Sequence, residues 1–192
     1  MAEKYKNKYR IESCRLQNWN YGWNGQYFIT ICTKNREHYF GEIIEGKMQL
    51  SNIGVIANIL WYEIKNHAKK IKIDEFVVMP NHIHGIITIE NDDLMDNVVV
   101  ETRHALSLQQ PQPQSQSIGQ QRFQNQGKNT ISSIIGGYKS AVTKHVNRLG
   151  YIFAWQPKFY DHIIRDDDSL HRIKKYILDN PKKWKNDNFY CG

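Results

Sequence analysis

The segment from Met79 to Ile89 constrains the fold most strongly, because two histidines lie in it inside a run that reads as a buried strand. Side chains alternate between two faces along a strand, so His82 and His84 share one face while Ile83, Ile87 and Ile89 share the other. The isoleucine face can pack on helices. Two imidazoles at positions i and i+2 of a rigid strand can take neighbouring places around one metal ion. The sequence therefore predicts a metal site on one face of a central strand.

Residue periodicity predicts the elements that surround this strand. Further strands are expected over Gln26–Thr33, Ile73–Met79 and Lys158–Arg165, and helices over Ser51–His67, Thr130–Leu149 and Leu170–Asn180, with a short hairpin near Gly41 and Gly46. The Pro80-Asn81 turn makes the strands on either side of it antiparallel. The order predicts an α+β, ferredoxin-like split βαβ fold, in which a four-stranded antiparallel sheet carries helices on one face. The extra C-terminal helix is then expected on the histidine face.

Composition predicts how the chain is divided. Residues 1–24 form a basic arm, residues 25–185 form the main domain, and residues 186–192 form a C-terminal tail. The main domain is interrupted at 91–128, where nine glutamines lie between Gln109 and Gln126 together with two prolines. Such a composition cannot bury enough apolar surface to offset the entropy of ordering. We therefore expect a disordered insertion with no chemistry of its own.

Charge and cysteine content narrow the class of protein. The net charge is +7, with 5 Trp, 11 Tyr and 7 Phe, which suits a nucleic-acid partner but also fits a merely soluble basic protein. The 3 cysteines are scattered, which argues against a disulfide framework and against a cysteine zinc site, and favours a reducing compartment. The chain has neither a signal peptide nor an apolar run that could span a membrane, so a cytoplasmic protein is expected.

The predicted last helix adds polar groups that could meet the histidines. Arg172, Tyr176 and Asn180 are spaced by four residues and form one row on a helix. If that row faces His82 and His84, a phenol nucleophile, an amide metal ligand and a phosphate-binding guanidinium meet at one point. Each part alone has a plainer reading, in which the histidines are satisfied core residues and the tyrosine is a packing residue. Only the combination favours a site.

Three stretches carry a family resemblance: VVMPNHIHG at 77–85, WQPKFYDHIIR at 155–165 and YILDNP at 176–181. They resemble the HUH class of single-tyrosine transposases, in particular the REP-associated tyrosine transposases and their IS200-like insertion-sequence relatives. The resemblance covers roughly residues 20–185 outside the insertion. It implies a catalytic domain that nicks single-stranded DNA next to a hairpin. In that family the tyrosine attacks the phosphate, becomes linked to the 5′ end and releases a 3′ hydroxyl.

The resemblance also implies roles for residues. Tyr176 is the expected nucleophile, and His82, His84 and Asn180 are the expected ligands of a Mg²⁺ or Mn²⁺ ion, although imidazoles also suit zinc. Some relatives carry Gln where this chain has the shorter Asn180. Tyr160 is a rival nucleophile, but it lies in a strand-like segment without the helical register. Contacts to DNA are expected from Arg172, Lys158, Arg165, Lys175, Lys182, Lys183 and Trp184.

Two other functions remain open on the sequence. A non-catalytic relative would bind structured nucleic acid without cutting it. A hydrolytic metallonuclease would use water in place of the tyrosine as the nucleophile. The expected partner in the main reading is single-stranded or hairpin DNA. A homodimer that shares its tyrosine helices between subunits and a self-sufficient single chain are both compatible with the resemblance.

Overall fold

The computed structural model describes residues 4–5, 8–9, 21–68, 70–90 and 129–190. The insertion expected at 91–128, most of the expected arm and residues 191–192 of the expected tail lie outside the described residues. Within the arm, β1 (Lys4–Tyr5) and β2 (Lys8–Tyr9) form a short antiparallel pair. Among the described residues, no helix combines the length and the apolar character that crossing a membrane requires.

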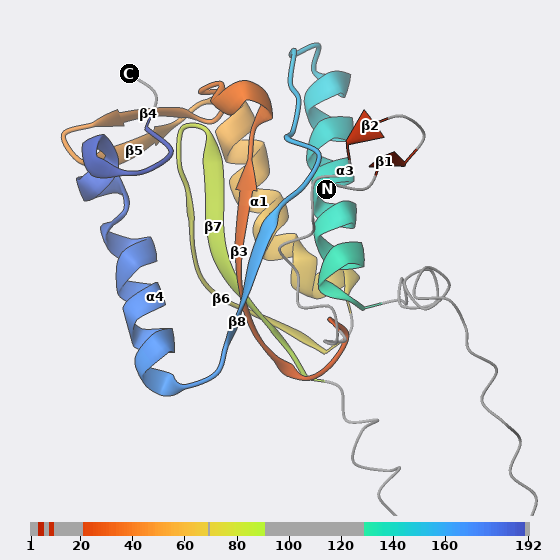
Figure 1. Ribbon diagram of the computed structural model, residues 1–192. Coiled ribbons are helices and arrows are strands. Elements are labelled where there is room, and N and C mark those ends of the chain that lie inside the picture. The colour runs from red at the N-terminus through yellow and green to blue at the C-terminus, as the bar shows by residue number, and fades with distance from the viewer. Residues whose placement is uncertain (1–3, 6–7, 10–20, 69, 91–128, 191–192) are drawn as a thin grey trace, which may run out of the picture.

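A four-stranded antiparallel sheet organises the main domain (Figure 1). Across the sheet, the strands are β6 (Ile71–Val78), β7 (His82–Ile89), β3 (Gly25–Cys32) and β8 (Tyr160–Ile164). In the chain, α1 (Asn52–His67) lies between β3 and β6, and α3 (Ile131–Arg148) lies between β7 and β8. This is the split βαβ arrangement, so the predicted fold class is confirmed.

A hairpin and a single-turn helix follow β3. The 3₁₀ helix η1 (Lys34–Arg36) leads to the hairpin formed by β4 (Gly41–Ile44) and β5 (Lys47–Leu50), which confirms the expected turn-rich passage. Gly41 has a φ of 133°, and a Cβ atom there would lie 2.0 Å from the carbonyl oxygen of Gln49. Only glycine fits this close approach between the two strands of the hairpin.

Polar side chains begin each helix. The Ser51 hydroxyl accepts a hydrogen bond from the Gly54 N–H at the start of α1, as the sequence predicts. Thr130 caps α3 in the same way. The last helix, α4 (Asp167–Asp179), begins after Asp166, whose carboxylate accepts from the Ser169 N–H at 2.7 Å. Pro181 then starts the 3₁₀ helix η3 (Pro181–Asn186).

The two faces of β7 separate two apolar clusters. Ile83, Ile87 and Ile89 are fully buried in the core that contains α1 and α3. Gly85 lies on the same face, where the Trp61 ring packs so closely that a Cβ atom on Gly85 would lie 2.4 Å from it. The alternation predicted from the sequence is therefore confirmed, and the histidines lie on the opposite face.

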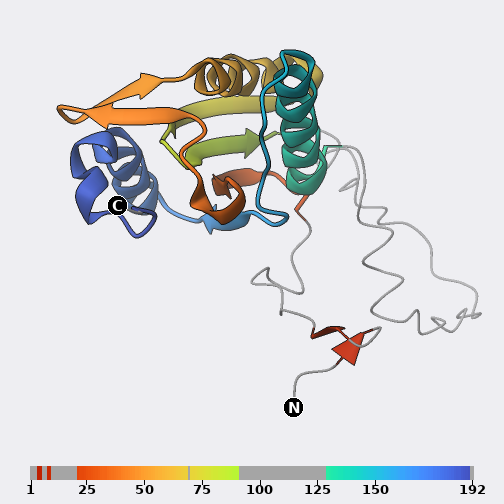
Figure 2. The same ribbon diagram turned by 90° about the horizontal axis from the view of Figure 1, so that it is seen from above.

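Helix α4 covers the histidine face (Figures 1 and 2). Ile177 is fully buried against Ile86 of β7 and Ile164 of β8, and Leu170 and Ile173 pack beside it. Burying a side chain of this size stabilises the folded state by about 1.5–3 kcal/mol. These apolar contacts position α4, as the sequence predicts.

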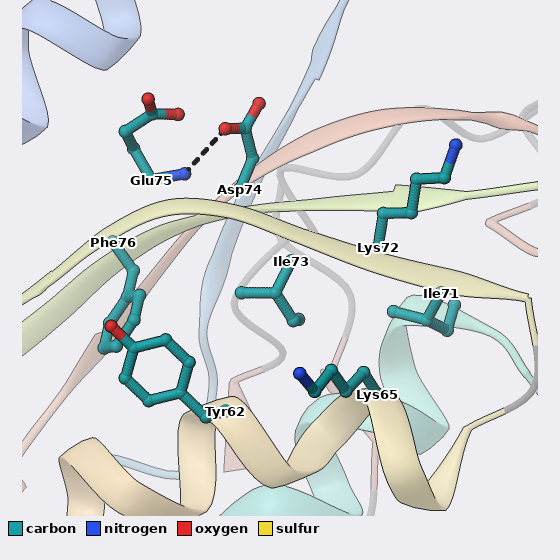
Figure 3. A pocket seen from close by; sticks show the side chains of 8 residues that line it. All are labelled: Tyr62, Lys65, Ile71, Lys72, Ile73, Asp74, Glu75 and Phe76. Carbon is teal, nitrogen blue, oxygen red and sulfur yellow. Dashed lines mark hydrogen bonds between the residues drawn. The ribbon is translucent and has the colours of Figure 1, made fainter.

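An ion-pair cluster fixes the same helix to the edge strand. The ammonium of Lys174 on α4 lies 2.7 Å from Asp74 and 2.9 Å from Glu75 on β6. The pairing register of β6 shifts between Ile73 and Phe76, so these two consecutive carboxylates lie on the same side of the strand (Figure 3). The irregularity in β6 therefore gives α4 a second point of attachment.

Two predictions about element ends are wrong. Leu149, expected as the last residue of the helix that begins after Thr130, lies outside it and is 62% exposed. The helix ends at Arg148, and Leu149 has φ −88° and ψ 5°, so its side chain no longer follows the buried stripe. The fourth strand is also shorter than expected, with bounds Tyr160–Ile164.

Candidate active site

The two histidines of β7 lie side by side beneath α4. His82 and His84 are 0% and 1% exposed, and their ring centroids are 4.4 Å apart. Because they are two residues apart on a strand buried on both faces, neither ring can move far. The alternation of the strand therefore produces a rigid imidazole pair.

The hydrogen bonds of Asn81 fix the tautomer of His82. The Asn81 side-chain N–H donates to the carbonyl of Phe189 at 2.8 Å, so its amide oxygen faces Nδ1 of His82, also at 2.8 Å. An amide oxygen only accepts, so Nδ1 of His82 carries the proton. Nε2 then has a free lone pair, and this buried atom has no hydrogen-bond partner among the described residues. A buried open lone pair of this kind is what a metal ligand presents.

Strand β3 holds the ring of His84 in place. Its Nδ1 lies 2.9 Å from the hydroxyl of Thr30, the residue paired with it on β3, and its ring stacks on Phe28 with centroids 5.2 Å apart. Its Nε2 lies 3.1 Å from the hydroxyl of Tyr176 on α4. The central strand and the last helix therefore meet through the two side chains that the sequence singled out.

Burial keeps both imidazoles neutral. Desolvation lowers the pKa of His84 to about 4, although the charge of Asp187 acts in the opposite direction. Desolvation, followed by the charges of His84 and Arg36, lowers the pKa of His82 well below its usual value. Neutral imidazoles retain the lone pairs that bind metal ions.

Tyr176 lies beside a carboxylate as well as an imidazole. Its hydroxyl donates to Oδ2 of Asp187 at 3.2 Å, and its ring meets Phe28 edge-on. Burial, then the charge of Asp187 and its hydrogen bond, raise the pKa of Tyr176 to about 12, while a hydrogen bond from Asn180 acts in the opposite direction. In this arrangement the phenol is protonated at neutral pH.

Asp187 and Asn180 complete the polar group around the histidines. Possible ligand atoms of His82, His84 and Asp187 all lie within 4.8 Å of one another. The Asn180 side-chain N–H donates to Asp187 at 2.8 Å, and its amide oxygen is buried without a hydrogen-bond partner among the described residues. Imidazole nitrogens, a carboxylate and an amide oxygen are all ligands of first-row divalent metals. The residues present therefore fit a divalent metal ion.

The residues predicted to contact DNA have different environments. Those that are exposed are Arg172, Lys158, Arg165, Lys175, Lys182 and Lys183. Trp184, in contrast, is 6% exposed, and its ring centroid lies 5.9 Å from that of His82, so it packs inside the protein instead of offering a surface to a base. Tyr160 lies on β8 and pairs with Thr30 of β3, while His84 pairs with Thr30 from the neighbouring strand β7. The strand β3 therefore separates Tyr160 from His84, and Tyr160 is 48% exposed.

Several residues near the histidines were missed by the sequence reasoning. Asp187 lies past the proline that follows α4, in the expected tail 186–192, where no residue had been singled out. Its one available signal is that it is an isolated acid after three lysines. Phe189 packs on His82 with centroids 4.5 Å apart, and Arg36 lies over the Phe189 ring at 5.2 Å and donates to the Asn188 carbonyl. Arg36 is the last residue of η1.

Comparisons with known proteins agree with this architecture. A protein of Haemophilus influenzae, described only as an uncharacterized protein, is 38% identical over 179 residues, which are 93% of this chain and 92% of that protein. Among solved structures, a REP-associated tyrosine transposase bound to a REP hairpin matches with a TM-score of 0.54 and 20% identity, over 91% of this chain and 74% of the other.

Other comparisons add little. A candidate transposase of Deinococcus radiodurans matches with a TM-score of 0.38 and 10% identity, over 88% of this chain and 95% of the other, which is too low to support an argument. A scan against models of protein families finds no match. The chain therefore belongs to one family with the Haemophilus influenzae protein, and its fold is that of the REP-associated tyrosine transposase, as its sequence motifs indicate.

Proposed function

We propose that this chain is a metal-dependent, transposase-like enzyme that nicks single-stranded DNA beside a hairpin and transfers the strand through a covalent bond to Tyr176. One observation carries the proposal: the Tyr176 hydroxyl lies 3.1 Å from Nε2 of His84, next to the open Nε2 of His82. A DNA hairpin as partner is supported by the similar fold of a transposase solved with a REP hairpin.

The proposed reaction exchanges one phosphoester for another. Attack by the Tyr176 oxygen on phosphorus forms a tyrosine–phosphate bond and breaks the bond to the 3′ oxygen. The 3′ oxygen leaves with the bonding electron pair and takes up a proton, while the phenol proton passes to an acceptor such as Asp187, 3.2 Å away. The 5′ phosphate stays on Tyr176, so a later 3′ hydroxyl can reverse the step. This reversal is strand transfer.

The protein residues orient the reacting groups. Thr30 and Asn81 fix the two rings, so that Nε2 of each histidine faces the site. A divalent ion such as Mg²⁺ or Mn²⁺, held by His82, His84 and Asp187 with Asn180 beside them, would supply positive charge to the phosphoryl oxygens. The same ion would offset the Asp187 charge that opposes ionisation of the phenol.

Trapping the covalent product tests this proposal. The probe is a single-stranded oligonucleotide with a hairpin, labelled at its 3′ end so that the label stays on the fragment that joins the protein. With Mn²⁺ or Mg²⁺, a labelled band of the size of the protein should survive denaturing electrophoresis. Tyr176→Phe should abolish it, while the matched control Tyr160→Phe should retain it. An adduct that persists in Tyr176→Phe would remove Tyr176 from the reaction.

A non-catalytic DNA-binding protein is the second candidate. The exposed Lys175, Lys182 and Lys183 favour it, because they can bind phosphates whether or not Tyr176 reacts. It predicts binding of the same oligonucleotide with no adduct and no cleavage. A hydrolytic metallonuclease would give cleavage with no adduct, and cleavage would survive in Tyr176→Phe.

A further inference from the structure

A groove beside the catalytic residues is not used by the proposed chemistry. It has a volume of about 630 Å³ and lies between the β4–β5 hairpin and η3. This space, called the η3 groove below, is lined by Glu42 and Glu45 from the hairpin, by Lys182 and Lys185 from η3, and by Trp184 and Tyr190. Its volume suits one small organic ligand.

The η3 groove adjoins the histidine pair. Trp184 forms part of its wall, and the Trp184 ring also lies close to His82, with centroids 5.9 Å apart. Pro80, two residues before His82, also lines it. Because Trp184 and Pro80 join this groove to His82, we expect a nucleotide next to the phosphate at Tyr176 to enter it.

The lining suits an unpaired base. Tyr190 is 42% exposed and is held edge-on by the buried Trp184, with centroids 5.4 Å apart, so it offers a fixed aromatic surface. Lysines line the same groove and can meet the backbone phosphates. Exposed rings together with cations are how proteins bind single strands, whereas the bases of a duplex are already stacked on one another.

Two carboxylates in this basic groove are the unusual feature. Glu42 and Glu45 would repel a phosphate, so the group that faces them must donate hydrogen bonds. Carboxylates accept from the exocyclic amino groups of bases, as Glu and Asp do from cytosine N4. Thymine has no amino group, and its single donor, N3–H, lies between two carbonyl oxygens that a carboxylate repels, so thymine meets a carboxylate less favourably than cytosine does.

We propose that the η3 groove binds an unpaired nucleotide next to the phosphate at Tyr176, stacks its base on Tyr190, and selects through Glu42 and Glu45 a base with an exocyclic amino group over thymine. This inference rests on the proposed function for the presence of a DNA strand at Tyr176. It assigns a base preference to the hairpin β4–β5, which takes no part in the chemistry.

Binding measurements on a protein that cannot react test the groove separately from the chemistry. Fluorescence anisotropy of labelled dC12 and dT12 is followed with full-length Tyr176→Phe protein. We expect several-fold tighter binding of dC12. Adding Tyr190→Leu should weaken dC12 binding roughly tenfold, because stacking is lost, whereas Tyr190→Phe keeps the ring and most of the affinity.

The ratio of the two affinities tests the carboxylates. Removing negative charge strengthens binding to any DNA, so only the dC12/dT12 ratio is informative. Glu42→Gln with Glu45→Gln should bring that ratio close to one, and the control Glu63→Gln on α1 should leave it unchanged. An unaltered ratio in the double variant, or equal losses in Tyr190→Leu and Tyr190→Phe, would overturn the groove assignment. Failure of the adduct experiment alone would overturn the strand transfer and leave these results standing.

Discussion

At the scale of single residues, the account depends on the open lone pair of His82. Asn81 fixes that ring from one side, and burial keeps it neutral. Asp187 supplies a carboxylate within 4.8 Å of both histidines, so three different side chains converge on one point. A polar atom that is buried without a partner costs stability, and a metal ion bound to Nε2 of His82 would remove that cost.

Metal binding can be measured without DNA. We expect the wild-type protein to bind one Mn²⁺ ion, as followed by calorimetric titration. His82→Ala and Asp187→Asn should each weaken this binding about tenfold or more, because each removes a ligand atom. The exposed His145 on α3 provides the control His145→Ala, which should bind like the wild type. Equal affinities for the wild type and His82→Ala would show that the histidine pair holds no metal.

Gly85 offers a stability test of the opposite face. In Gly85→Ala, the new methyl group would lie 2.4 Å from a ring atom of Trp61 and 2.9 Å from Cβ of Phe76. Overpacking of this kind should lower the free energy of unfolding by about 2 kcal/mol, measured by urea titration. Gly136→Ala in α3 meets no atom within 4 Å and should stabilise the protein by up to about 1 kcal/mol. A neutral Gly85→Ala would mean that Trp61 does not pack on β7.

At the scale of elements, the attachment of α4 to the sheet decides whether Tyr176 meets His84. Ile177 anchors the middle of the helix, and Lys174 anchors it to β6. Burial alone would raise the pKa of Asp74, but hydrogen bonds from Glu75 and Lys174 and the Lys174 charge outweigh it and lower that pKa. A carboxylate with a lowered folded-state pKa stabilises the fold above its unfolded-state pKa and loses this contribution as pH falls.

The Lys174 cluster therefore predicts a pH dependence. Lys174→Met should lower the free energy of unfolding at pH 6 by roughly 1 kcal/mol, a small value because these side chains remain partly exposed. The difference in free energy of unfolding between the two proteins should begin to shrink as pH falls below about 3.9, the pKa of an Asp in the unfolded chain. It should be lost as pH falls further, through the lower pKa that Asp74 has in the folded protein. Denaturant titrations between pH 2.5 and 6 measure it. Lys175→Met, on the next residue of α4, is the control and should show no such trend. A difference for Lys174→Met that is constant with pH would contradict the ion-pair account.

At the scale of the whole molecule, one chain contains both halves of the candidate site. Tyr176 reaches His84 of its own chain, so we expect no exchange of the tyrosine helix between subunits. A mixture of the Tyr176→Phe and His84→Ala proteins should therefore form no more covalent adduct than either protein alone. Adduct formation in the mixture would show that α4 of one chain serves the histidines of another.

How much of this could be predicted from the sequence depends on the range of the interaction. Alternation along β7 placed His82 and His84 opposite Ile83 and Ile87, because a strand sets the direction of its side chains locally. The last helix was predicted from residue periodicity, which is also a local property, and Ile173 and Ile177 repeat at helical spacing within it. Local periodicity also showed which side of α4 is apolar, and the histidine face was the face that the other two helices leave uncovered.

The rest of the site depends on chain segments that have no periodic pattern. Asp187 and Phe189 follow a 3₁₀ helix, and their positions result from how that short helix packs on β5 and from the hydrogen bond between Asn81 and the Phe189 carbonyl. No spacing in the sequence encodes that contact. Trp184 was predicted to contact DNA from its composition alone, whereas its burial follows from tertiary packing.

The most direct test of the central claim is the mass of the peptide that carries the DNA. The trapped adduct is digested with a protease and a nuclease, and the modified peptide is sequenced by mass spectrometry. The account predicts a nucleotide joined through its 5′ phosphate to Tyr176 and to no other tyrosine. It predicts no modified peptide from the His84→Ala protein. A nucleotide attached to Tyr160, or to any residue away from the histidine pair, would contradict it.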